Sequence, residues 1–262
     1  MNIIVLVKQV PDTTEIKIDP VTKTIIRAGV PNIINPDDLA GIEEALRLKE
    51  RYGGTVTTIT MGPPQAELMI KELFARGVDF GYLLTDVKFA GSDTWATSKI
   101  LSSFIKTLKY DLIIAGYQAI DGDTAQVGPQ VAAFLDIPQV THVNKIIGVN
   151  QNELVLEKLY ENEVVALGVK LPALITSLKA MNSPRLMNAH DIWNLEQKEV
   201  VKVTFADMSV NPSEIGLLGS PTRVKTTYTK TISEKSPIEC LDPEQAAKRI
   251  VDLIKPYMTE GK

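Results

Sequence analysis

The sequence predicts an α/β fold built on a mostly parallel sheet, and two patterns in its first half support this. Short apolar runs rich in β-branched residues recur over residues 3–8, 55–61, 82–86 and 112–116. Segments with the period of a helix lie between them, so strands and helices alternate along the chain. Such alternation builds a parallel sheet with helices on both faces, and strands that are apolar throughout are typical of burial on both faces.

Each predicted helix places its apolar residues on one face and charged residues on the other. The segments are 37–51, 64–76 and 93–108, and a further helix follows Asp123 or Thr124 and ends near Asp136. One of those two side chains is expected to be its N-cap. Two alternating runs flank Asp19-Pro20 within residues 15–29, which predicts a β-hairpin inserted after the first strand.

The pattern changes after Asp136. Residues 141–149, 153–160 and 163–179 look like a run of strands, and we expect them to extend the sheet at one edge. Pro172 lies within the last run and should begin a strand or lie at an edge, because proline has no N–H to donate.

Beyond Pro184 few apolar residues recur with the spacing of a buried helix or strand. A final helix is expected over 243–256, with Asp242 as its N-cap. A long segment without structure of its own is usually functional or disordered. We expect this one to be an arm that folds against another protein.

The composition excludes several classes of function. A formal net charge of −4 gives no overall basic field for nucleic acid, and two histidines with one cysteine make a zinc site improbable. The single Cys240 allows no intramolecular disulfide, which fits a reducing compartment, and no histidine neighbours it as a base. No segment has the ~20 apolar residues of a membrane span, so we expect a cytoplasmic protein without membrane insertion.

Ligands of open parallel α/β sheets bind outside the carboxyl ends of the strands. In this sequence those corners are rich in polar residues and glycine: Lys8–Thr13, Asn35–Asp38, Met61–Pro63, Gly91–Thr94 and Gly116–Gly128. Each corner alone can be explained as a helix cap or a solvated strand end. Because all five lie on one rim, we expect them to converge on one ligand.

The corner after Gly116 has the most turn chemistry. Asp121-Gly122 is a turn pair in which the glycine tolerates a positive φ. The N–H groups of Thr124, Ala125 and Gln126, with the dipole of the helix that follows, form an anion site. A capped turn without a ligand explains the same residues. Neither GxGxxG nor GxxxxGK[ST] occurs, so the corner matches no common phosphate fingerprint.

Several stretches together resemble the β subunit of electron-transfer flavoprotein. They are VKQVPDT (7–13), INPDDLAGIEEALRLKE (34–50), TITMGP (58–63), GYQAIDGDTAQVGPQVAAFLD (116–136) and LPALIT with NSPR (171–185). The resemblance implies a Rossmann-like sheet of the adenine-nucleotide-hydrolase type with added strands and a C-terminal extended arm. It also implies a heterodimer with an α subunit that carries FAD.

Carried over residue by residue, the resemblance implies a nucleotide held by the rim. The residues implied are Leu6, Asn35, Pro36, Asp37, Asp38, Met61, Ala119, Ile120, Asp121, Gly122, Asp123, Thr124, Ala125, Gln126, Val127, Gly128, Pro129 and Gln130. Tyr117 departs from relatives that often carry a basic residue there. Redox chemistry belongs to the flavin, so no catalytic side chain and no metal ligand are expected.

The family has two branches. One holds AMP at this site and only relays electrons. The other holds FAD there, oxidises NADH, and bifurcates the electrons to ferredoxin or flavodoxin and, through the α-subunit FAD, to an acyl-CoA dehydrogenase. VKQVPDT, GDTAQVGP and YENEVVALGVKLPALIT look more like the bifurcating branch. Candidates near the nicotinamide are Asp12, Thr13, Asp93 and Thr94.

The family's recognition loop for the dehydrogenase follows the Pro-Arg of NSPR, which implies residues 186–193 here. Leu186, Met187, Ala189 and Trp193 are the partner-binding candidates there, with Arg223 on the arm toward the α subunit. Ala189 departs from the leucine of the respiratory type, so the partner stays open, and core packing is the alternative for Trp193. We expect a nucleotide-binding domain over 1–185 and a recognition loop and arm over 186–262.

A non-redox nucleotide-binding module of similar fold is a further hypothesis, which predicts a stable monomer. Ile215, Leu217 and Leu218 on the arm argue against it, because a monomer would leave these apolar side chains in water.

Overall fold

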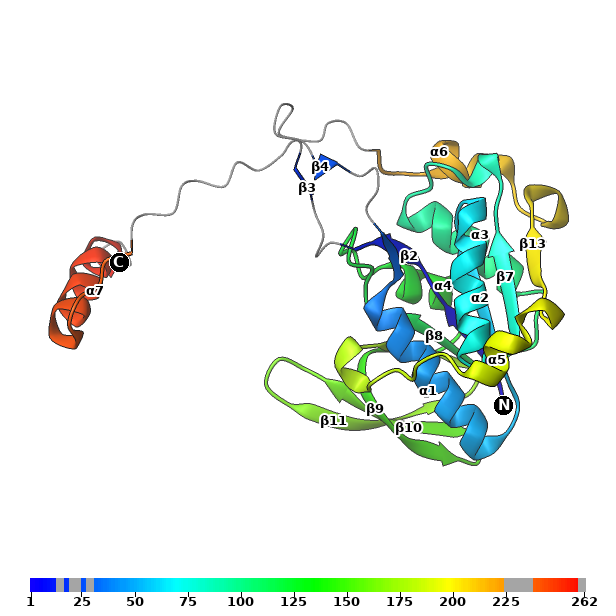
Figure 1. The fold of residues 1–262 in the computed structure, drawn as a ribbon, viewed down its shortest axis with the longest axis horizontal. Coiled ribbons are helices and arrows are strands. Elements are labelled where there is room, and N and C mark those ends of the chain that lie inside the picture. The colour runs from blue at the N-terminus through cyan, green and yellow to red at the C-terminus, as the bar shows by residue number, and fades with distance from the viewer. Residues whose placement is uncertain (13–16, 19–24, 27–30, 224–237, 259–262) are drawn as a thin grey trace. The chain divides into compact units, whose positions relative to one another are not determined.

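The structure is a computed structural model that describes residues 1–12, 17–18, 25–26, 31–223 and 238–258 (Figure 1). The chain divides into two compact units, Met1–Lys225 and Thr226–Lys262, which are described separately.

Among the described residues of the first unit, nine strands form one sheet. In spatial order they are β11 (Val164–Lys170), β10 (Glu153–Leu159), β9 (Gln139–Asn150), β12 (Ala173–Ser177), β8 (Leu112–Gly116), β1 (Asn2–Leu6), β6 (Thr55–Met61), β7 (Phe80–Leu84) and β13 (Val200–Val203). All neighbours from β9 to β13 pair in parallel, and β10 and β11 are antiparallel additions. This confirms the mostly parallel sheet with added edge strands.

Four helices cover the sheet: α1 (Pro36–Tyr52), α2 (Glu67–Ala75), α3 (Thr94–Ile105) and α4 (Val127–Leu135). Alternation along β1 divides the core, because successive side chains point to opposite faces. Ile3 and Val5 pack with α1 and α2, whereas Ile4 and Leu6 pack with α3 and α4. All four are almost fully buried, and each such side chain contributes about 1.5–3 kcal/mol to stability.

The helix ends follow from the sequence. Pro36 begins α1 with its φ already set for a helix, and Asp37 and Asp38 lie in the first turn, where the dipole favours negative charge. Asp93 caps α3 by accepting the N–H of Ala96 at 3.0 Å. The predicted helices at 37–51, 64–76 and 93–108 are therefore confirmed with small shifts at their ends.

The remaining elements are short. They are β2 (Gln9–Pro11), β3 (Lys17–Ile18), β4 (Ile25–Ile26), β5 (Asn32–Ile34), η2 (Pro64–Ala66), η3 (Val87–Phe89), η4 (Lys179–Met181), α5 (Ala189–Trp193), η5 (Leu195–Gln197), η6 (Phe205–Asp207), η7 (Pro212–Glu214) and α6 (Gly216–Gly219). β3 and β4 pair antiparallel, as the predicted hairpin requires, and its Asp19-Pro20 turn lies outside the described residues.

Two predicted boundaries are wrong. The apolar run 163–179 contains two strands, because β11 ends before Leu171-Pro172 and β12 begins directly after Pro172, which agrees with the expected place of this proline at the start of a strand. β12 lies inside the sheet between β9 and β8 and not at the edge expected for the run. The helix expected after Asp123 or Thr124 begins only at Val127 and has Gln126 as its N-cap. The loop continues because Asp123 and Ala125 have left-handed φ angles of 47° and 53°, which end any regular helix.

The segment after Pro184 differs most from expectation. β13 adds to the sheet beside β7, and Val200, Val203 and Ile215 are buried in the core of the first unit. Leu217 and Leu218 are exposed as expected, but the expectation that Ile215 would lie in water is wrong, because it packs in the core of the first unit. The buried apolar side chains of this segment extend the first unit's own core, and the compact unit accordingly spans Met1–Lys225.

The second unit contains the predicted C-terminal helix as α7 (Pro243–Met258). Asp242 accepts the N–H groups of Glu244 and Gln245, which confirms it as the cap. Ile250, Leu253 and Ile254 on this helix are exposed. None of the helices in the described ranges is long and apolar enough to cross a membrane.

Candidate functional site

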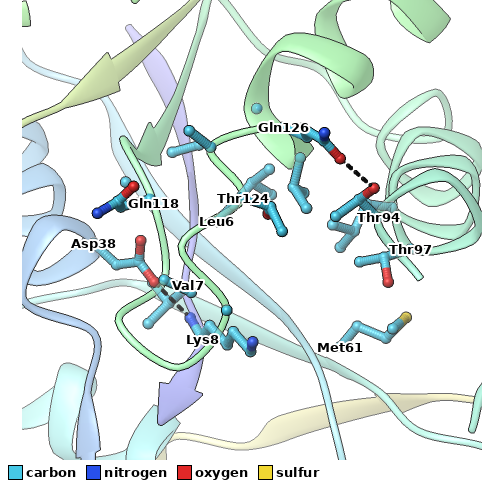
Figure 2. Close-up of a pocket in the computed structure, with 18 of the residues that line it drawn as sticks. Leu6, Val7, Lys8, Asp38, Met61, Thr94, Thr97, Gln118, Thr124 and Gln126 are labelled. Carbon is cyan, nitrogen blue, oxygen red and sulfur yellow. Dashed lines mark hydrogen bonds between the residues drawn. The ribbon is translucent and has the colours of Figure 1, made fainter. Parts of the chain in front are cut away.

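A cavity of about 370 Å³ lies at the carboxyl ends of β1, β6 and β8 (Figure 2). Its walls come from all five predicted corners. They include Leu6 and Lys8, Asp38, Met61, Asp93 and Thr94, and much of the stretch from Gly116 to Gly128. The structure thus brings together around one cavity corners that are far apart in sequence, and the ligand expected there stays a prediction.

The predicted site residues divide into two groups. Those that line the cavity are Leu6, Asp38, Met61, Asp93, Thr94, Ala119, Gly122, Thr124, Ala125, Gln126, Val127 and Gly128. Those that do not line it are Asp12, Asn35, Pro36, Asp37, Ile120, Asp121, Asp123, Pro129 and Gln130. Thr13 lies outside the described residues.

Sequence reasoning missed several lining residues. Ile59, Thr97 and Leu101 also face the cavity. Periodicity could have found them, since Ile59 is two residues before Met61 on β6, and Thr97 and Leu101 follow Thr94 on one face of α3. Tyr117 lines the cavity as well, and its ring lies 4.2 Å from that of His142, which no local pattern indicates.

Asn35 is fully buried and joins two corners of the rim. Its amide nitrogen donates to the carboxylate of Asp38 at 2.9 Å and to the carbonyl of Gln118 at 2.8 Å. Its amide oxygen accepts the N–H of Ile120 at 3.2 Å. Since the side chain makes no capping bond to α1, the alternative that it is only a helix cap is wrong.

The two acids that follow also tie the rim together. Asp38 accepts the backbone N–H of Lys8 at 2.7 Å. Burial raises the pKa of this carboxyl to about 7, because its effect exceeds that of the hydrogen bonds from Asn35 and Lys8, which lower the pKa. Asp37 accepts the N–H of Lys179 at 2.6 Å. The first turn of α1 is thereby fastened to β1 and to the segment after β12.

Two glycines allow close approach at this corner. A Cβ on Gly116 would collide with the carboxylate of Asp38, so only glycine lets α1 lie against the end of β8. A Cβ on Gly128 would lie 2.9 Å from the Thr176 methyl, so glycine lets α4 lie against the sheet.

Gly122 does not have the role expected of it. Its φ is not positive, and a Cβ built on it meets nothing within 4 Å. The left-handed positions are its neighbours Asp123 and Ala125. A larger side chain at position 122 is therefore not expected to strain the turn.

The loop before α4 presents a row of donors. The N–H groups of Gly122 and Asp123 both bond the carbonyl of Ala119, which closes a turn. Within the described residues, no acceptor pairs with the backbone N–H groups of Thr124, Ala125, Gln126, Val127 and Gly128. Unpaired N–H groups at the start of a helix attract anions, so this loop has the chemistry of a phosphate cradle.

The opposite wall is the start of α3. The Thr94 hydroxyl donates to the Gln126 side chain at 2.7 Å, as Figure 2 shows, and Ser98 donates to Gln130 at 3.0 Å. Asp93 caps α3 and accepts the N–H and hydroxyl of Thr222. Burial alone would raise the pKa of Asp93, but its hydrogen bonds from Ala96 and Thr222 outweigh burial and hold the pKa low.

Within the described residues, no group of three or more His, Cys, Asp and Glu side chains is arranged as metal ligands would be. The donors that converge on the cavity are backbone N–H groups, hydroxyls and the ammonium of Lys8. That donor set suits a phosphate-bearing organic ligand.

Comparison with known proteins agrees with this architecture. The model of the electron transfer flavoprotein domain matches residues 22–208, which include the rim from Asn35 to Gln130. The chain belongs to the electron transfer flavoprotein family.

The curated relatives of this family match over nearly the whole chain. The electron transfer flavoprotein subunit beta of Thermoanaerobacterium thermosaccharolyticum is 49% identical over 96% of this chain and 97% of its own length. The subunit of that name from Clostridium acetobutylicum is 48% identical, over 97% and 98%. The caffeyl-CoA reductase-Etf complex subunit CarD of Acetobacterium woodii is 45% identical, over 87% and 88%.

The segment that the family resemblance marks for partner recognition is held by Arg185. Its guanidinium donates to Glu43 at 2.9 Å and also pairs with Glu50. Burial alone would raise the pKa of Glu43, but the hydrogen bonds from Arg185 and Arg47 outweigh it and lower the pKa. The N–H of Asn188 then bonds the carbonyl of Ala75 at 2.8 Å, which seats the segment on α2.

The side chains of that segment point outward. Leu186 is 84% exposed and Trp193 87%, and Met187, Ala189 and Ile192 are exposed too. Core packing of Trp193, the alternative at the sequence level, is therefore wrong. Arg223 is exposed at the end of the described part of the first unit.

Proposed function

We propose that the chain is the β subunit of a cytoplasmic, electron-bifurcating electron transfer flavoprotein and that its cavity holds FAD. The observation that carries this proposal is the row of N–H groups from Thr124 to Gly128 beside a cavity. When bound, FAD would accept hydride from NADH and pass electrons to ferredoxin or flavodoxin and, through the α-subunit FAD, to an acyl-CoA dehydrogenase.

The residues of the chain bind and orient the nucleotide in this proposal. The N–H groups of the loop hold phosphate oxygens, helped by the dipole of α4. Leu6, Ile59 and Met61 supply an apolar wall that excludes water. Asn35 and Asp38 fix the start of α1 relative to the ends of β1 and β8. The proposal assigns no catalytic step to any side chain.

We also propose where NADH approaches the cavity. Thr94 lines the cavity and bonds Gln126, so the nicotinamide would approach along the start of α3. The carboxylate of Asp93 is already bonded to Ala96 and Thr222, so its expected effect on NADH is through the position of α3.

The partners follow from the exposed segment 186–193 and from the relatives. CarD of Acetobacterium woodii is by name a subunit of a complex that joins a CoA-ester reductase to an Etf. Leu186, Met187 and Trp193 offer the exposed apolar side chains that such a partner would cover. We propose that this segment binds the acyl-CoA dehydrogenase and that Arg223 and α7 bind the α subunit.

The alternative is a relay subunit that holds AMP. A cavity of 370 Å³ lies near the lower end of the roughly 300–1,000 Å³ of small-molecule sites, which favours a smaller nucleotide. A non-redox monomer is disfavoured, because the exposed Leu186 and Trp193 would then have no partner.

Nucleotide analysis decides between the two branches. The chain is co-expressed with its α subunit, and the nucleotides released on denaturation of the purified heterodimer are identified. Bifurcation predicts FAD from both subunits and reduction of the bound flavin by NADH. FAD from the α subunit alone, accompanied by AMP, would establish the relay subunit. Release of neither nucleotide from this chain would refute both forms.

A further inference from the structure

Lys8 has a fixed backbone and a side chain that crosses the rim. Its N–H bonds Asp38 at 2.7 Å, and its carbonyl accepts the N–H of Asn35 at 3.0 Å. Its Nζ lies 2.7 Å from both carboxylate oxygens of Asp121, in the loop after β8. Figure 2 shows the side chain extending from the end of β1 into the space between Asp38 and Met61.

The charges around the cavity make this lysine distinctive. Lys8 is the one cation among the residues that line the cavity in the described part of the chain, and Asp38 and Asp93 also line it. A phosphate or pyrophosphate brings further negative charge to this wall. Backbone N–H groups carry only partial charges, so Lys8 is the side chain that can supply a full positive charge.

The ion pair that Lys8 makes is easily exchanged. The side chains of Lys8 and Asp121 are 50% and 30% exposed. An ion pair with that much exposure shifts an equilibrium by about fivefold at most. A phosphate forms stronger charge-assisted hydrogen bonds than a solvated carboxylate pair, so it can displace Asp121 from the ammonium.

We propose that Lys8 contacts the phosphate of the nucleotide and that Asp121 competes with the phosphate for it. Nucleotide binding then exchanges one partner of Lys8 for another and releases residue 121 from the end of β1. The inference rests on the proposed function, because it concerns the same cavity, and it assigns to Lys8 the selection of phosphorylated over unphosphorylated ligands.

The test uses the heterodimer freed of nucleotide and titrated with AMP, FAD and adenosine, which has no phosphate. Lys8→Met is expected to weaken AMP and FAD by about 10- to 100-fold and to leave adenosine unchanged. Lys8→Arg keeps the charge and should retain most of the affinity. Asp121→Asn is expected to tighten AMP by about two- to fivefold, because the competitor is gone. That gain should vanish in Lys8→Met/Asp121→Asn.

A matched control is Lys71→Met, which removes an ion pair of similar length, 2.8 Å to Glu67, on α2 and away from the cavity lining. It should change none of the three affinities. Equal loss of adenosine and AMP in Lys8→Met would show that Lys8 only supports the fold. Weaker AMP binding in Asp121→Asn would show that the pair holds the loop and does not compete. Either result overturns the inference while the proposed function stands, whereas a wild-type protein that binds neither AMP nor FAD overturns both.

Discussion

At the scale of one residue, Asp38 holds the rim together although its burial makes ionisation of its carboxyl group unfavourable. Its carboxyl group is almost fully buried, and it fastens the end of β1 to the start of α1 through the N–H of Lys8. Ionisation of a buried carboxyl is unfavourable, which is why its pKa rises to about 7 from an ordinary 3.8. The residue therefore couples the folding of the rim to pH.

The sign of that coupling can be predicted. The folded protein binds this proton more tightly than the unfolded chain does. The resulting stability is fully present below about pH 4 and is lost as the pH rises to about 7. The amide of Asp38→Asn does not titrate, so the free energy of unfolding of this variant should fall less between pH 4 and pH 7 than that of the wild type. Urea unfolding across that range measures both curves, and equal slopes would contradict the prediction.

At the scale of elements, the site depends on how closely α1 approaches β8. Gly116 ends the strand, and its missing side chain makes room for the first turn of the helix. The hydrogen bonds from Asn35 to Gln118 and Ile120 then hold the loop after the strand. The position of the loop after β8 is thus set by the close approach of the first turn of α1 to Gly116 and by the side-chain hydrogen bonds of Asn35.

Gly116→Ala should disturb that contact. The added Cβ would overlap Asp38, and overpacking of this kind costs about 1–3 kcal/mol of the free energy of unfolding. We also expect weaker AMP and FAD binding, because the loop moves with the strand end. Gly122→Ala is the matched control, since open space surrounds its Cβ, and should change stability by less than about 0.5 kcal/mol. Equal unfolding curves for the two variants would count against the packing argument.

The same scale explains what could be predicted from sequence. The rim was predictable because the carboxyl ends of parallel strands always meet at one edge, whatever the loops do. The left-handed angles of Asp123 and Ala125 were not, since non-glycine residues rarely adopt them and a glycine stands next to them. β13 was missed as well, because pairing with β7 defines it and the local pattern of four residues does not.

At the scale of the whole molecule, the chain combines a compact unit with a helix whose apolar face is exposed. The unit Met1–Lys225 contains the sheet and both cores. α7 exposes Ile250, Val251, Leu253 and Ile254, and such a face normally marks a binding surface. Lys8 and Asp121 lie 113 residues apart, so their pairing also belongs to this scale.

A chain that ends at Lys225 is therefore expected to fold with the unfolding midpoint of the full-length protein. It should lose most of its affinity for the α subunit, because the apolar face of α7 is gone. Thermal unfolding and co-purification with the α subunit measure the two effects separately. A full-length chain with Ile250→Ser and Ile254→Ser should show the same loss of affinity. A lowered midpoint for the shortened chain would contradict the independence of the first unit.

The place of β13 has a consequence for synthesis on the ribosome. β7 is complete once residue 84 has emerged, but the strand that covers its edge ends only at residue 203. The nascent sheet must expose the backbone of β7 throughout that interval, and open edges invite pairing with other chains. Ser220 and Thr222, which bond Asp93 at the head of α3, emerge later still. The wall of the cavity at Asp93 can therefore reach its final form only after residue 222 has emerged, more than a hundred residues after α3 itself.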